Sequence, residues 1–89
     1  MTERLWSYPP ELADALRGFG LAPAPHTPPR FVRDQLSDQY RFEIRRLRGQ
    51  LLAGVIAKPD YAGHVLVLRK KYWPLSLTPD HWDRICGGS

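Results

Sequence analysis

Apolar side chains recur at intervals of three or four residues along four segments of the chain, the spacing that places them on one face of an α-helix. From this pattern we predict helices at about residues 9–18, 28–53, 59–73 and 79–86. The second helix carries the longest stripe, which comprises Val32, Leu36, Tyr40, Ile44, Leu47 and Leu51. The predicted fold class is therefore all-α: a small bundle of three to four helices built on a long antiparallel helical hairpin, with the first and last helices packed across it.

Local signals mark the ends of these segments. Each begins near a proline, in the sequences YPPELADAL, TPPRFVRDQL, KPDYAGHVL and TPDHWDRIC, and proline suits the first turn of a helix because its missing N–H would be unpaired there anyway. Thr27 and Thr78 are the expected N-cap residues of the second and fourth helices. Gly54 is expected to end the second helix in a left-handed conformation.

The stretch HVLVLRKKYWPLSL, residues 64–77, permits two interpretations. Residues 65–68 are apolar and partly β-branched without polar alternation, so the segment 64–68 is compatible with a buried strand. A helix is favoured by the start signal at Pro59 and Asp60 and by the lack of a second strand pattern elsewhere in the sequence. One helical face is formed by Tyr61, Val65, Leu68 and Tyr72. We predict the helix and keep the strand as the alternative.

The turn between the second and third predicted helices has a recognisable pattern. Two leucines precede a Gly-x-Ile turn, and an aromatic residue follows seven positions after the glycine, here as Leu51, Leu52, Gly54, Ile56 and Tyr61. On these residues, segment 44–72, about 30 of the 89 residues, resembles the short C-terminal helical hairpin called the SHOCT domain. The chain departs from that family's pattern in having Lys-Pro-Asp at 58–60, where acidic residues are usual, and in having flanking helices. The resemblance implies a helical hairpin associated with oligomerisation or protein contacts, with no catalytic residues.

Length and composition indicate one small domain, residues 1–89, with 43% hydrophobic and 25% charged residues. Within it we expect residues 1–8 to be flexible, residues 20–28 to form a proline-rich linker, and residues 87–89 to be a flexible tail. A single cysteine, Cys86, excludes an internal disulfide and is typical of a reducing compartment. The longest apolar run, LLAGVIA, is far shorter than the ~20 residues that span a bilayer, so we expect a cytoplasmic protein without a membrane partner.

Basic residues form two groups, and the net charge of the chain is +4. The groups comprise Arg41, Arg45 and Arg48 on the second helix, and Arg69, Lys70 and Lys71 at the end of the third. In an antiparallel hairpin they lie near one another and can contact phosphates, so binding of nucleic acid or another polyanion is one hypothesis. The favoured interpretation is a solvated or ion-paired face, because Asp34, Asp38 and Glu43 can pair with the arginines and the helix dipole favours cations at a C-terminus.

Several large apolar residues lie off the predicted stripes. Phe42, Leu52 and Leu66 are the examples on the predicted hairpin, and such residues left over on a small domain indicate contact with another chain. We therefore predict a non-enzymatic module for protein interaction or oligomerisation, a homodimer or an accessory subunit of a larger complex, whose partner is itself or another protein. The alternative is that these residues pack under the terminal helix and the linker.

The sequence contains no pattern that indicates catalysis, a cofactor or a metal. His26, His64, His81 and Cys86 do not have the spacing of metal ligands. No phosphate-binding glycine loop is present. We interpret Cys86 as a small buried side chain and predict no enzymatic activity and no cofactor.

Overall fold

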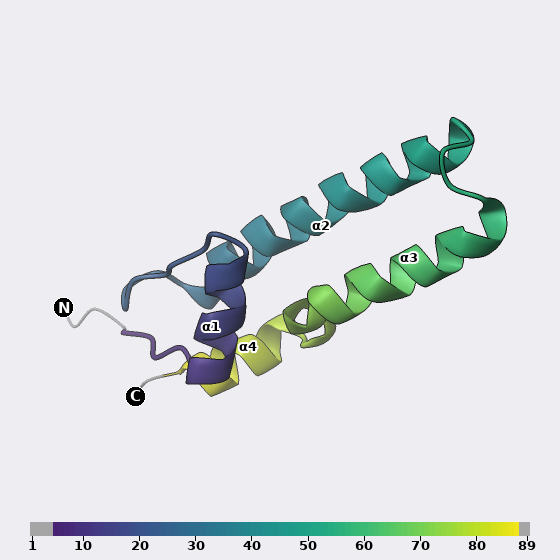
Figure 1. Ribbon diagram of the computed structural model, residues 1–89. Coiled ribbons are helices and arrows are strands. Elements are labelled where there is room, and N and C mark those ends of the chain that lie inside the picture. Colours follow the sequence, from purple (N-terminus) through teal and green to yellow (C-terminus); the bar gives the residue numbers. More distant parts are fainter. Residues whose placement is uncertain (1–4, 88–89) are drawn as a thin grey trace.

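The computed structural model describes residues 5–87 of the chain and is helical throughout its regular elements (Figure 1). These elements are α1 (Pro10–Gly18), α2 (Pro29–Leu52), α3 (Lys58–Lys71), the 3₁₀-helix η1 (Trp73–Ser76) and α4 (Pro79–Cys86). The prediction of an all-α fold is confirmed. Residues 64–68 lie inside α3, so the helical interpretation of that stretch is correct and the strand alternative is wrong.

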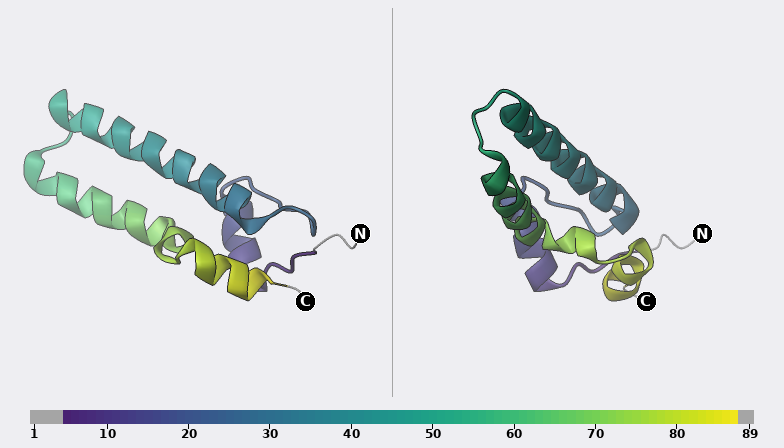
Figure 2. Two further views of the ribbon diagram at one scale, coloured as in Figure 1. Left: turned by 180° about the vertical axis from the view of Figure 1, so that it is seen from behind. Right: turned by 90° about the vertical axis from the view of Figure 1, so that its right-hand side faces the viewer.

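The helices α2 and α3 form a long antiparallel hairpin, and α1 and α4 gather at its open end (Figures 1 and 2). We expected the first and last helices to pack across the hairpin. They cover only the open end, because η1 turns the chain so that α4 runs beside the beginning of α2, beyond the end of α3 (Figure 1). The molecule is therefore elongated, with principal extents of 56 × 20 × 18 Å.

The hydrophobic core lies at this open end, which we call the base (residues 5–40 and 72–87). Its buried members come from α1, α2 and α4 and from the residue that follows α3, and they are Leu12, Leu16, Val32, Leu36, Tyr72, Trp82 and Cys86. Trp82 is fully buried and its indole Nε1 donates to the carbonyl oxygen of Pro74 at 2.8 Å. The guanidinium of Arg33 donates to the carbonyl oxygens of Leu75 and Leu77 at 3.2 and 3.1 Å. These bonds fix η1 and α4 against the first half of α2.

The rest of the hairpin, residues 41–71, projects from the base as a two-helix arm. The structure describes the whole of this segment, and only Leu47 within it is buried, with 8% of its surface exposed. The apolar stripe of α2 continues through the arm as predicted, but its later members are only half-buried because α3 alone covers them. The arm is thus one helix thick on each side of a thin apolar seam.

The predicted helix ends are confirmed in part. The hydroxyl of Thr78 accepts from the backbone N–H of His81 at 3.1 Å, the N-cap bond that was expected. Thr27 is not the N-cap of α2: that position is Pro28, and Thr27 instead accepts from the N–H of Ala24 at 3.1 Å. Gly54 has a φ of 77°, the left-handed conformation expected at the end of α2. The helix α3 ends at Lys71 instead of residue 73: Tyr72 has φ −95° and ψ 37°, and proline at position 74 has no N–H with which to continue the hydrogen bonds of the last turn.

Hydrogen bonds connect residues 6–8, from the segment expected to be flexible, to the proline-rich linker and to α4. The N–H of Trp6 donates to Pro25 at 2.6 Å and the N–H of Ser7 donates to Cys86 at 2.8 Å. The hydroxyl of Tyr8 donates to the carbonyl of Thr27 at 2.7 Å. Residues 5–8 therefore lie between the proline-rich segment and α4. The expectations for residues 1–4 and 88–89 fall outside the described residues.

Candidate interaction surface on the helical arm

Charge is distributed unevenly between the arm and the base. Residues 41–71 contain eight basic and two acidic residues, a net charge of +6, whereas the rest of the sequence contains five basic and seven acidic residues, a net charge of −2. The arm cations are exposed to solvent, and within residues 5–87 only two of them form an ion pair. Arg41 pairs with Asp38 at 3.8 Å, and Lys71 pairs with Glu43 at 3.4 Å. The remaining arm cations are available to an anionic partner.

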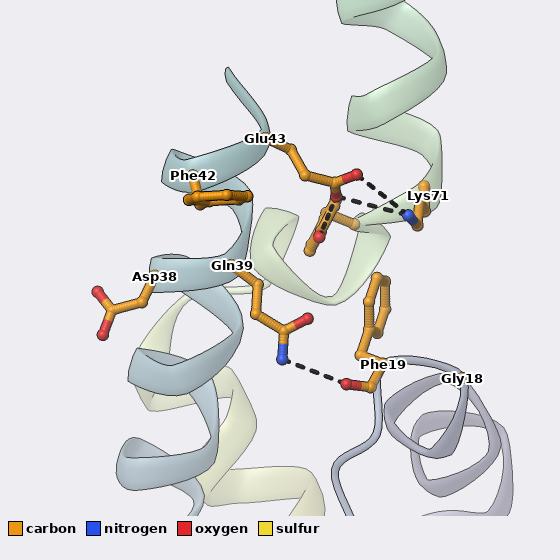
Figure 3. Close-up of a pocket in the computed structure, with 8 residues that line it drawn as sticks. Gly18, Phe19, Asp38, Gln39, Phe42, Glu43 and Lys71 are labelled. Carbon is orange, nitrogen blue, oxygen red and sulfur yellow. Dashed lines mark hydrogen bonds and ion pairs between the residues drawn. The ribbon is translucent and has the colours of Figure 1, made fainter. Parts of the chain in front are cut away.

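The junction of arm and base is formed by a cluster around Glu43 (Figure 3). Its carboxylate accepts a hydrogen bond from the hydroxyl of Tyr72 and contacts the ammonium of Lys71 at 3.4 Å. The ring of Tyr72 stacks on Phe19 with centroids 4.5 Å apart and meets Tyr40 edge-on at 5.3 Å. Figure 3 shows Glu43, Lys71 and Phe19 converging from α2, α3 and the segment after α1. This cluster ties three elements together where the core ends.

The surroundings of Tyr72 at this junction favour the neutral form of its phenol over the phenolate. Burial, the hydrogen bond to Glu43 and the negative charge of that carboxylate together raise the pKa of Tyr72 well above its usual value. The ammonium of Lys71 lies 5.5 Å from the centroid of the Tyr72 ring and 5.8 Å from that of Phe19, within the range of a cation–π contact. Glu43 and Lys71 are therefore engaged within the chain.

The apolar residues proposed for protein contact are all exposed, but they do not form one surface. Phe42, Leu52 and Leu66 expose 66%, 81% and 55% of their surfaces. Phe42 lines a shallow pocket of about 500 Å³ at the junction, whose other lining residues include Glu43 and, across the pocket, Phe19 (Figure 3). Leu52 is the last residue of α2, at the closed end of the hairpin. Leu66 lies two residues from the inward-facing Leu68 and so points away from α2.

Two further apolar residues on the arm are exposed, of which Val55 was not expected from the sequence, whereas Val67 lies off the predicted face of its helix in the same way as Leu66. Val55 in the turn and Val67 on α3 expose 72% and 65% of their surfaces. Val67 precedes Leu68, which faces α2, and the helical rotation of about 100° per residue places it at the edge of the seam. That rotation was the available signal, since the predicted face of α3 left out both Leu66 and Val67.

The seam between α2 and α3 has two different sides. On one, which we call the carboxylate side, a groove of about 250 Å³ is lined by Glu43, Arg46, Leu47, Gln50, His64, Val67 and Leu68. Arg46 and Arg48 flank the buried Leu47, so Arg48 points to the opposite side, which we call the arginine side. Likewise Val67 and Arg69 flank Leu68, and Arg69 lies on the arginine side, where it lines a pocket of about 270 Å³.

This geometry divides the basic residues predicted to contact an anion. Arg41 is two helical turns before Arg48 and shares the arginine side with it and with Arg69. Arg45 and Lys70 are two residues from Leu47 and Leu68 respectively, so both point outward. Lys71 lies on the carboxylate side and pairs with Glu43. The predicted cluster is therefore split, and its largest group in one place is Arg41, Arg48 and Arg69.

The histidines and the cysteine do not converge. His26 lies in the segment before α2, His64 lies on the arm and His81 lies on α4. Among residues 5–87 no group of three or more His, Cys, Asp or Glu side chains is arranged to hold a metal ion. Cys86 is completely buried, and burial, with the nearby charge of Asp83, raises its thiol pKa to about 11. The thiol is thus protonated and inaccessible at neutral pH.

Comparison of the chain with protein-family models, with curated proteins and with solved structures gave no match. Within the described residues, no helix combines the length and apolarity required to cross a lipid bilayer. The functional argument consequently rests on the arm itself.

Proposed function

We propose that the protein is a non-enzymatic interaction module that contacts another protein chain through its helical arm. The observation that carries this proposal is the arm's apolar surface: Phe42, Leu52, Val55, Leu66 and Val67 each expose more than half of their surface on a two-helix projection that contains a single buried residue. These side chains lie on more than one face of the arm, so the arm lacks the cover that the base has, and this favours contact with another chain. The base, in contrast, has a complete core of its own.

Two further points support the proposal. The resemblance of residues 44–72 to the SHOCT hairpin implies a role in oligomerisation or protein contacts. The proposal includes a cytoplasmic location, for which the support is the single cysteine and its burial. The proposed interaction function is compatible with two kinds of partner, a second copy of the chain and a different protein.

Photo-crosslinking from matched phenylalanines tests this function. Phe31 and Phe42 expose 64% and 66% of their surfaces on the same helix, but Phe31 belongs to the base and Phe42 to the arm. They are eleven residues apart, three turns of helix, and so share one face of α2. Replacing each in turn by a benzophenone-bearing phenylalanine analogue gives two probes with similar exposure, one in the base and one in the arm.

In cells of the source organism, irradiation of the Phe42 probe is expected to give a discrete adduct with a protein, while the Phe31 probe gives little. Mass spectrometry distinguishes a second copy from another protein. Equal labelling from both probes, or no adduct from Phe42 and none from a further probe at Leu66, would show that the arm is not the contact site.

A second candidate function is binding of a polyanion such as nucleic acid. It is favoured by Arg45, Arg48, Arg69 and Lys70, for which the described residues provide no carboxylate within ion-pair distance. Phosphate binding of this kind weakens steeply as salt concentration rises. A gel-shift series with single-stranded and duplex oligonucleotides, at about 50 and 200 mM salt, tests it. Absence of a shift at the lower concentration eliminates this candidate.

A further inference from the structure

The two sides of the arm differ in the partner that each can accept. Resting on the proposed function, we propose that the arginine side binds an acidic amphipathic helix of a different protein, which completes a three-helix bundle with α2 and α3. The docking surface consists of an apolar floor along the seam, flanked by Arg41 and Arg48 on α2 and by Arg69 on α3.

The apolar floor has a defined anchoring point. At the base end of the arginine side, Tyr40, Tyr72 and Leu75 line a pocket of about 270 Å³ together with Arg69 and Ser76. That volume accommodates one large apolar side chain of a partner. Towards the closed end of the hairpin the floor continues through the half-buried Ile44 and Val65, which flank the seam on this side. A helix laid along the seam therefore meets apolar surface over its whole length.

The cations beside this floor have no acidic neighbours on the arm. Both arm carboxylates lie on the other side: Glu43 lines the carboxylate-side groove, and Asp60 is two helical turns before Val67, which lines the same groove. On the arginine side, Arg48 and Arg69 have no ion pair within the described residues. Arg41 has one, to the exposed Asp38 at 3.8 Å. Carboxylates of a partner therefore find two cations without an internal partner, Arg48 and Arg69, and a third, Arg41, that is paired only with an exposed carboxylate.

Charge also selects among the possible occupants. A second copy of the arm carries the same net charge of +6, so association of two arms along this side opposes like charges. A nucleic acid satisfies the charge but places its phosphates, not apolar groups, against Tyr40, Ile44 and Val65. An amphipathic helix with acidic residues on both edges of an apolar stripe matches floor and rims together.

The spacing of the cations specifies the partner further. Arg41 and Arg48 are seven residues apart, which is about 10 Å along α2, so acidic residues at positions i and i+7 of a parallel or antiparallel partner helix can reach both. The floor from Tyr40 to Leu51 extends about 16 Å, the length of a helix of about eleven residues. The occupant is thus a helix of three to four turns.

Binding of a designed peptide tests this surface. The probe is a fluorescent 18-residue helical peptide with leucines at heptad a and d positions and glutamates at the flanking positions; the control peptide has lysine in place of every glutamate. Fluorescence anisotropy with the full chain is expected to show binding of the glutamate peptide and at least tenfold weaker binding of the lysine peptide. Arg48→Glu is expected to weaken binding of the glutamate peptide about tenfold, and Arg46→Glu less than threefold.

The pair Arg48→Glu and Arg46→Glu is closely matched. Both residues are exposed on α2, neither has an ion pair among the described residues, and both substitutions change the net charge equally, but the two side chains point to opposite sides of the seam. Equal loss in both variants would show that only overall charge matters and would overturn the proposal. Circular dichroism establishes that each variant is folded.

Other outcomes overturn the proposal in distinguishable ways. No binding of the glutamate peptide refutes the acidic-helix surface, and complete displacement by a lower concentration of a 20-nucleotide single strand assigns the side to a polyanion. A dimer in light scattering that Arg48→Glu dissociates assigns it to a second copy. If a Phe42 crosslink to another protein persists in any of these cases, the interaction function stands and only the location and chemistry proposed here fail.

Discussion

The hydrogen bond between Tyr72 and Glu43 should measurably stabilise the junction of arm and base. Tyr72→Phe removes the hydroxyl but keeps the ring, which is 4% exposed and stacked on Phe19. A hydrogen bond to a charged group contributes ~1.5–3 kcal/mol. The Glu43 side chain is 31% exposed, so water replaces part of this bond in the variant. We therefore expect Tyr72→Phe to lower the free energy of unfolding by about 1–1.5 kcal/mol.

A double-mutant cycle isolates this bond from other effects. Glu43→Gln keeps an acceptor for Tyr72 but removes the charge and the ion pair with Lys71, for a loss of about 0.5–1 kcal/mol, because partly exposed ion pairs contribute little. The two residues are in direct contact, and the glutamine of Glu43→Gln retains a neutral acceptor, so the double variant is expected to lose about 0.5 kcal/mol less than the sum of the single variants. Urea unfolding followed by circular dichroism, analysed by linear extrapolation, gives each value.

Tyr61→Phe is the control for removal of a phenol hydroxyl. Tyr61 is half-buried on α3, and no hydrogen bond to its hydroxyl is present within the described residues. This variant should change the free energy of unfolding by less than about 0.5 kcal/mol. If Tyr72→Phe were no more destabilising than Tyr61→Phe, or if the coupling energy with Glu43→Gln were zero within error, the junction would not depend on this bond and the reasoning would be wrong.

Three other properties of the chain give expected outcomes. Gly54→Ala should destabilise the protein by about 1–2 kcal/mol, because position 54 has a φ of 77°. Gly49 lies in the interior of α2 with open space around it, so Gly49→Ala should stabilise the protein by about 0.5–1 kcal/mol in the same urea assay. Leu36→Ala, in the base, should cost about 3–4 kcal/mol, and Leu47→Ala, in the arm, about 2 kcal/mol or less, because the cavity left in a two-helix arm opens to water. Stability should fall as pH rises above 9, because burial raises the thiol pKa of Cys86 from 9.0 to about 11 and the thiol of the unfolded chain therefore ionises first. The stabilisation that the protonated Cys86 gives the folded state is complete below pH 9 and is lost towards pH 11. Cys86→Ala should therefore make the unfolding curves at pH 8 and pH 10.5 differ less than they do for the unaltered protein.

Most of the secondary structure could be predicted because its signals are local. Proline at helix starts, the hydroxyl of Thr78 and the glycine at position 54 act on the backbone within a few residues, and the structure has helices close to where these signals place them. Thr27 shows the limit of such a signal. The two prolines that follow it shift the N-cap to Pro28, and the threonine hydroxyl binds Ala24 instead.

The division into base and arm could not be predicted, because hydrophobic periodicity identifies a buried face and not what covers it. The stripe of α2 is uniform in sequence, yet Leu36 is fully buried and Ile44 only half-buried, since three elements surround the first and α3 alone covers the second. The same limit applies to the charges. Lys71 and Arg69 look alike in sequence, but one pairs with Glu43 and the other lines the opposite side.

The composition of α3 is the strongest reason to expect a partner for the arm. A helix that contacts one neighbour needs an apolar stripe on one face only, whereas a helix with apolar residues around most of its circumference is typical of burial on several sides. In α3, Tyr61, Val65 and Leu68 face α2, while Leu66 and Val67 are exposed by 55% and 65% on other faces. The described chain supplies one helix to cover α3, and no residue of α3 is buried as a result. Removal of apolar surface from water contributes roughly 25 cal/mol per Å², before the entropic costs of association are subtracted, and the isolated fold leaves this contribution of Leu66 and Val67 unused.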